Sequence, residues 1–95
     1  MPVFTVYGYS GCGYFYSACK AVEGIADTSV SLVKDERPRA EYKAWLRANE
    51  GVPSHHTTSP ACFKDGEFVG GCSELRALLA REYNVSGGGI PCALL

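Results

Sequence analysis

The sequence predicts a single α/β domain with a four-stranded mixed sheet and three helices. A chain of 95 residues is long enough for one domain with one modest core. Apolar residues make up 46% of the chain and charged residues 20%, which is typical of a folded globular protein. Segments of β-type and helical periodicity follow each other in the order βαβαββα, and this order predicts helices on both faces of the sheet.

The first three elements predict a βαβ unit. Residues 3–7 are rich in β-branched and aromatic side chains, alternate in polarity and end at Gly8, so a strand is expected. Apolar residues recur at helical spacing over residues 13–26, which predicts a helix with one buried face. Residues 29–33 predict a second strand, parallel to the first through a right-handed crossover.

The middle of the chain predicts a turn, a helix and a loop. Residues 34–37 are interpreted as a polar turn, and Pro38 suits the first turn of a helix. That helix is expected to end at Gly51. Residues 52–59 are then expected to form a polar loop.

A hairpin and a last helix are predicted to complete the domain. Asp65-Gly66 between the short segments 61–64 and 67–69 is typical of two antiparallel strands. The last helix has Ser73 near its N-cap, and we interpret its leucines as a core-facing stripe rather than a partner-binding motif. The domain is expected to span residues 1–85.

Residues 86–95 predict a flexible tail, because they begin with a serine followed by three glycines. The final four residues, Cys92 to Leu95, fit the C-a-a-X pattern of prenylation. No polybasic segment precedes them, and one prenyl chain anchors weakly. Membrane attachment is therefore expected only if Cys92 is prenylated.

Charge and hydropathy argue against several classes of partner. Nine Lys and Arg residues and ten Asp and Glu residues give a net charge of −1, so no basic excess supports binding to nucleic acid. The apolar runs are shorter than the roughly 18 residues that cross a membrane. No secretory signal is visible at the N-terminus, so a cytoplasmic location with reduced thiols is expected.

Five cysteines are the unusual feature of the composition, and Cys12 is the one most suited to chemistry. It lies between the first strand and the first helix, with Gly11 and Gly13 on either side. Unpaired N–H groups and the macrodipole at a helix N-terminus stabilise an anion such as a thiolate. Cys12 is therefore a candidate solvent-facing nucleophile, although a cysteine that only caps the helix fits the local sequence equally well.

Two other segments could form a site with Cys12. Pro60 precedes a strand that is expected to be central, and a cis bond after Ser59 would turn the Ser59 backbone outward. Residues 70–73 form a second glycine-containing junction between strand and helix, whose N–H groups can bind an anion. If both junctions lie at one edge of the sheet, they face one groove; otherwise these glycines only mark turns.

Three segments together resemble the glutaredoxins, a family of the thioredoxin-fold superfamily: VYGYSGCGYF at residues 6–15, TSPACF at 58–63 and GEFVGGCSEL at 66–75. They occur in the family's order, within residues 3 to about 83. The resemblance implies a thioredoxin-like fold and a glutathione-dependent thiol-disulfide oxidoreductase that acts on glutathionylated protein thiols, with Cys12 as nucleophile. The residues it assigns to glutathione binding are Tyr14, Ser59, a cis Pro60, Gly71, Cys72, Ser73, Glu74 and, more weakly, Arg47.

Departures from the family pattern determine the expected mechanism. The common glutaredoxin motif is Cys-Pro-Tyr-Cys, whereas Gly13 and Phe15 here replace the proline and the second cysteine. The resemblance therefore implies monothiol chemistry, with glutathione as co-substrate. Cys72 is a candidate for a partial resolving role, although a packed small residue whose backbone binds the ligand is favoured. Tyr9 replaces a family lysine that pairs with the glycine carboxylate of glutathione.

The glycine carboxylate of glutathione could instead contact Arg47 or His56, although either residue could simply be solvated.

A second function is also open, because family members with glycine after the cysteine can carry a [2Fe–2S] cluster between two subunits. Cys12 would then be the metal ligand, and the protein a glutathione-ligated homodimer. The Cys-Gly-Phe-Ser motif typical of those carriers is missing, so a monomeric oxidoreductase is favoured.

Overall fold

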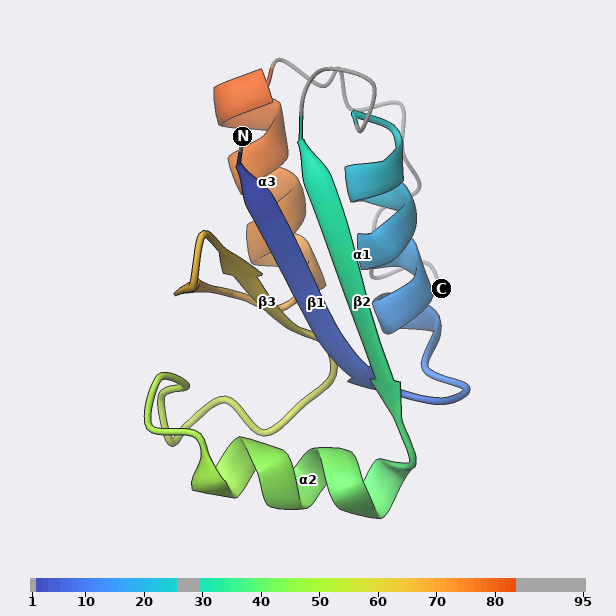
Figure 1. Ribbon diagram of the computed structural model, residues 1–95, viewed down its shortest axis with the longest axis vertical. Helices are drawn as coiled ribbons and strands as arrows, with labels where there is room; N and C mark the ends of the chain where they lie inside the picture. Colours follow the sequence, from blue (N-terminus) through green and yellow to red (C-terminus); the bar gives the residue numbers. More distant parts are fainter. Residues whose placement is uncertain (1, 26–29, 84–95) are drawn as a thin grey trace.

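The computed structural model describes residues 2–25 and 30–83 (Figure 1). Its strands are β1 (Val3–Tyr9), β2 (Ser31–Arg37), β3 (Ala61–Lys64) and β4 (Glu67–Gly70). Its helices are α1 (Gly13–Glu23), α2 (Arg39–Ala48) and α3 (Cys72–Tyr83). This order confirms the predicted βαβαββα arrangement.

The four strands form one mixed sheet in the spatial order β2-β1-β3-β4. β1 and β2 are parallel, with Val3 opposite Ser31 at one end and Tyr9 opposite Arg37 at the other. β3 is antiparallel to both of its neighbours. The parallel pair is connected through α1, as the predicted βαβ unit requires.

Alternation of side chains along the strands divides the core into two layers. Phe4 and Val6 of β1 pack in one cluster with buried residues of α1 and α3. Tyr7 of β1 and Phe63 of β3 belong to the other cluster, which contains Tyr42 of α2. Successive residues of a strand point to opposite faces of the sheet, so helices cover both faces. In Figure 1, α2 crosses near the carboxyl ends of β1 and β2.

The prediction for β2 was wrong at its carboxyl end. Residues 34–37, expected to be a turn, belong to the strand. Their charged side chains are tolerated because β2 lies at the edge of the sheet, where polar groups reach solvent. Arg37 and Asp35, two residues apart on one side of the strand, form an ion pair at 2.7 Å. The paired strand β1 likewise continues through Gly8 to Tyr9.

The helix ends also differ from the sequence prediction by a few residues. α1 ends at Glu23, α2 ends at Ala48 before Gly51, and Pro38 is the N-cap of α2 rather than part of its first turn. α3 begins at Cys72, so the N-cap lies before Ser73. Propensity does not fix terminal residues, because tertiary contacts decide where a helix ends.

The proposed domain boundary at residue 85, the tail at 86–95 and its prenylation pattern lie outside the described residues. Within residues 2–25 and 30–83, none of the helices has the length and apolar character that a bilayer span requires.

Candidate functional site

Cys12 is the N-cap residue of α1, and its backbone is extended, with φ −82° and ψ 114°. Its N–H donates to the carbonyl of Tyr9 at 3.2 Å, and its carbonyl accepts from the N–H of Tyr16 at 3.3 Å. The Cys12 side chain makes no capping hydrogen bond, and the first turn of α1 contains no acidic residue. No first-turn carboxylate therefore offsets the partial positive charge of this helix N-terminus, which favours an anion near it.

The Cys12 sulfur faces the loop that precedes β3. Its Sγ lies 3.8 Å from the carbonyl oxygen of Ser59, to which the thiol donates. Cys12 is only 7% exposed, so the expectation of a solvent-facing thiol is not met. Cys12 belongs to the buried cluster that α1 and α3 form against the sheet, and the Ser59 backbone contacts its sulfur.

The turn before Cys12 is fixed to the end of β2. Ser10 N–H donates to the Arg37 carbonyl at 2.9 Å, and Gly11 N–H donates to the Tyr16 hydroxyl at 3.1 Å. The Tyr16 hydroxyl in turn donates to Oε2 of Glu36 at 2.9 Å. Gly11 has φ +89°, a conformation that favours glycine. Sequence reasoning missed Tyr16 and Glu36, because only the pairing of β1 with β2 brings them to this turn.

Phe15, which stands at the position of the family's second cysteine, anchors the first turn of α1 to β1. It is 1% exposed. A Cβ atom added at Gly8 would lie 2.3 Å from Cδ1 of Phe15, so the ring packs directly against the Gly8 backbone. A close approach of this kind requires glycine in the strand.

The loop before β3 is held from both sides. The Ser59–Pro60 peptide bond is cis, as the resemblance implied. The buried Tyr42 hydroxyl donates to the Thr58 carbonyl at 2.7 Å, and burial raises the pKa of Tyr42, so the hydroxyl stays protonated. The imidazole Nε2 of His56 lies 3.0 Å from the Pro60 carbonyl oxygen. Ser59 Oγ is buried without a hydrogen-bond partner among the described residues.

A groove of about 370 Å³ lies between this loop, Tyr14 in the first turn of α1 and the start of α3, and Cys12 is not among the residues that line it. Its lining includes Tyr14 of α1, Ser59 of the loop and the start of α3. The full set of lining residues is Tyr14, His56, Thr58, Ser59, Gly71, Cys72, Ser73 and Glu74. The structure therefore brings together most of the predicted glutathione-binding residues, beside the loop that contacts Cys12.

The N-terminus of α3 carries its own carboxylate. Gly71 N–H donates to Oε1 of Glu74 at 2.7 Å, which is half of a capping box. Gly70 has φ +140°, and a Cβ atom there would lie 2.6 Å from Cβ of Glu74. Glu74 thus takes up one of the N–H groups that were expected to hold a ligand carboxylate.

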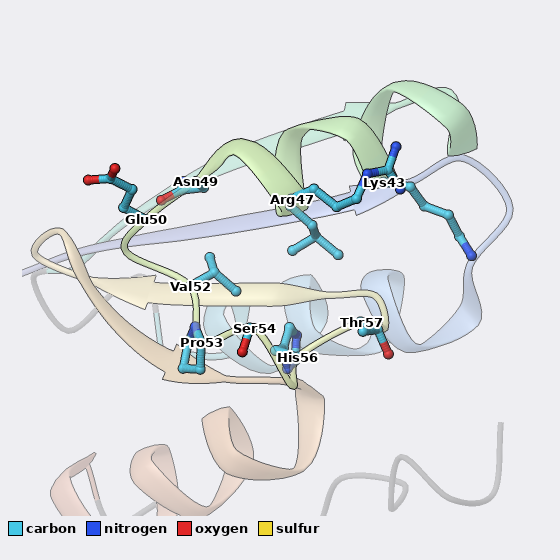
Figure 2. Close-up of a pocket in the computed structure, with 10 residues that line it drawn as sticks. Lys43, Arg47, Asn49, Glu50, Val52, Pro53, Ser54, His56 and Thr57 are labelled. Atoms are coloured by element: carbon cyan, nitrogen blue, oxygen red, sulfur yellow. The ribbon is translucent and has the colours of Figure 1, made fainter.

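Arg47 does not line this groove. It lines a neighbouring pocket of about 420 Å³, with Lys43 on the same helix and Pro53, His56 and Thr57 on the loop across from it (Figure 2). His56 lines both hollows, so the pocket adjoins the groove.

The other described cysteines differ from Cys12 in state or environment. Cys12, Cys19 and Cys62 are free thiols, whereas Cys72 is disulfide-bonded, which differs from the expectation of reduced thiols. In that state Cys72 cannot act as a resolving thiol. Burial raises the pKa of Cys19 to about 11 and raises the pKa of Cys62 further.

No group of three His, Cys, Asp or Glu side chains within the described residues could hold a metal ion.

Solved structures of glutaredoxins share this fold. The chain is similar to glutaredoxin 1 from Francisella tularensis complexed with cacodylate, with 19% identity and a TM-score of 0.68 over 88% of this chain and 99% of that one. It is also similar to reduced Escherichia coli glutaredoxin, with 25% identity and a TM-score of 0.63, and to a second E. coli glutaredoxin structure, with 24% identity and a TM-score of 0.58. Each of these two covers 87% of this chain and 99% of the other.

No protein-family model and no curated protein matches the sequence. The structural likeness nevertheless extends over nearly the full length of these glutaredoxins. The chain therefore has the thioredoxin-like fold of the glutaredoxins, as the sequence predicted.

Proposed function

We propose that this protein is a glutathione-dependent thiol-disulfide oxidoreductase that reduces glutathione mixed disulfides by a monothiol mechanism, with Cys12 as the nucleophile. One observation carries the proposal: the Cys12 sulfur lies at a helix N-terminus without a side-chain cap, against the Ser59 carbonyl that borders the groove. The partial positive charge at a helix N-terminus favours a thiolate, which is the reactive form of cysteine.

The reaction needs two thiol-disulfide exchanges. The Cys12 thiolate attacks the glutathione sulfur of the mixed disulfide, the old S–S bond breaks, and the protein thiol leaves as a thiolate that takes up a proton. Cys12 is then disulfide-bonded to glutathione. A second glutathione thiolate attacks that glutathione sulfur, which releases glutathione disulfide and restores the Cys12 thiolate. Each cycle therefore consumes one free glutathione: the protein sulfur is reduced to a thiol, and the incoming glutathione sulfur is oxidised as it joins the glutathione taken from the mixed disulfide. A reducing compartment such as the cytoplasm would provide that glutathione.

The groove has the polarity that glutathione requires. Glutathione carries an amine and two carboxylates on a short peptide. The N-terminal end of α3 favours a carboxylate, and the Glu74 carboxylate favours an amine. Tyr14 and Ser59 would line the middle of the ligand. Arg47 would reach a carboxylate only if the ligand extends past His56 into the neighbouring pocket.

The surroundings of Cys12 support a single-thiol mechanism. Phe15 is buried where a second cysteine would stand, and Cys19 and Cys62 are buried thiols whose pKa values burial raises. A neutral thiol is a poor nucleophile. Cys12 is therefore the described cysteine best placed to exchange with a disulfide.

The test is to replace Cys12 and to follow glutathione release from a glutathionylated peptide by chromatography. We expect Cys12→Ser to lower the rate at least about a thousandfold, because the nucleophile is lost. Cys19→Ser is the matched control and should keep most of the activity, since at pH 8 only about one Cys19 in a thousand is a thiolate. Loss of activity in Cys19→Ser with an unchanged circular dichroism spectrum would contradict the single-thiol mechanism.

The alternative function is that of a [2Fe–2S] cluster carrier, and a reconstitution experiment distinguishes it from the oxidoreductase. Each chain would contribute Cys12 alone, so two subunits and two glutathiones would have to complete the four thiolate ligands. Visible absorption after anaerobic reconstitution with iron, sulfide and glutathione would indicate the carrier. A colourless monomer that still releases glutathione from the peptide would support the oxidoreductase.

A further inference from the structure

Three basic residues lie along one face of α2. Arg39, Lys43 and Arg47 follow each other at intervals of four residues, which places them one above another on the helix. All three side chains are exposed. We call these three residues the basic stripe.

The basic stripe has no carboxylate partner among the described residues. Four other basic side chains form ion pairs: Lys34, Arg37, Lys64 and Arg81. Like charges four residues apart on a helix repel each other and destabilise it. In a chain with a net charge of −1, this concentration of uncompensated positive charge indicates a role outside the fold.

The basic stripe borders the proposed active site at both ends. The guanidinium carbon of Arg39 lies 5.4 Å from the ring centroid of Tyr9, whose carbonyl accepts from Cys12 N–H. At the other end, Lys43 and Arg47 line the pocket that adjoins the groove through His56 (Figure 2). A polypeptide whose glutathione mixed disulfide is attacked by Cys12 would therefore have the basic stripe beside it.

We propose that the basic stripe docks an acidic segment of the protein that carries the glutathione mixed disulfide. This inference rests on the proposed function and adds a substrate class to it: glutathionylated cysteines with Asp or Glu side chains nearby. Charge complementarity selects this occupant, because exposed, unpaired cations attract carboxylates and increase the rate of association.

The experiment compares two glutathionylated peptides that differ only in glutamate or glutamine residues near the modified cysteine. We expect the wild-type protein to have a kcat/KM about tenfold higher for the acidic peptide at low salt. The double variant Arg39→Gln/Lys43→Gln should bring this ratio close to one. Salt at 1 M should do the same, because the Debye length falls to about 3 Å.

Two variants serve as controls. Lys20→Gln removes an exposed lysine from α1, away from the basic stripe, and should keep the preference for the acidic peptide. Arg39→Lys/Lys43→Arg retains both charges and should keep the preference as well, which separates charge from any effect on the fold of α2.

Equal kcat/KM values for the two peptides with the wild-type protein would overturn the docking proposal, as would a double variant that keeps the preference. An equal loss for both peptides in the double variant would assign the cations to glutathione itself and would also overturn it. No glutathione release from either peptide by the wild-type protein would overturn the proposed function, which is a different result.

Discussion

The two helix N-termini beside the groove share one packing contact, in which the third helical residue lies against a strand glycine, but they differ in chemistry. In α1 the N-cap is Cys12, and the third helical residue, Phe15, packs over Gly8 of the preceding strand. In α3 the third helical residue, Glu74, packs over Gly70 in the same way. The Glu74 carboxylate binds the N–H of Gly71, whereas Phe15 offers no acceptor at all.

This difference shows how one arrangement serves two purposes. An apolar third residue packs α1 against the sheet and offers no acceptor to the N–H groups at the start of the helix, beside Cys12. An acidic third residue satisfies part of the N-terminus of α3 from within the chain. The side chain at this position thus decides how many N–H groups of each helix end are left for another anion.

Replacing Phe15, the apolar residue at the junction of β1 and α1, has the largest expected effect. Phe15→Cys places a second thiol three residues after Cys12, and we expect the two sulfurs to form a disulfide on oxidation, seen as a change in mass and gel mobility. Loss of the buried ring should also lower the free energy of unfolding of the reduced protein by about 3 kcal/mol. Phe15→Ser is the control, because it loses the ring without gaining a thiol. An oxidised variant without any change in mass would contradict the placement of Phe15.

A substitution that disturbs the contact between Gly8 and Phe15 should have a smaller effect on stability. Gly8→Ala should lower the free energy of unfolding by about 1–3 kcal/mol, because the new methyl group would overlap the Phe15 ring. Urea denaturation measures this change. In the Phe15→Ala background the same substitution should cost less, because the ring is gone. Equal costs in the two backgrounds would contradict direct packing between the two residues.

Removing Glu74, the acidic residue at the junction of β4 and α3, has the smallest expected effect. Glu74→Ala should lower the free energy of unfolding by about 1 kcal/mol, because the N–H of Gly71 loses its acceptor. Thermal denaturation measures the change. Ser73→Ala, at the neighbouring exposed position, is the control and should change stability by less. A Glu74→Ala protein as stable as the wild type would show that the carboxylate does not stabilise α3.

Local sequence patterns predicted the fold where a few adjacent residues determine the backbone. At Asp65-Gly66 both φ angles are positive, +51° and +86°, as the hairpin prediction requires. The end of β2 was misread because its charged residues look like a turn, and only the neighbouring β1 strand makes them part of the sheet. Strand formation there depends on tertiary pairing that a local pattern does not contain.

The same distinction applies to the site. Cys12 and the glycines before α3 could be found because helix N-termini have a recognisable sequence pattern. The contacts of Tyr16 with Glu36 and of Tyr42 with the Thr58 carbonyl could not be predicted. They join residues from separate elements, and their geometry follows from how those elements pack. Arg47 was placed in the groove by resemblance, whereas the packing of α2 puts it in the adjoining pocket.

The position of β2 at the edge of the sheet has a consequence for solubility. Within the described part of the chain, no strand pairs with its outer side. Unpaired strand edges can recruit strands of other molecules and start aggregation. Four consecutive charged residues occupy this strand, and Lys34 is held by Glu23 of α1 at 3.0 Å. A second copy adding to this edge would have to bring its own strand against these charged side chains, which disfavours edge-to-edge pairing.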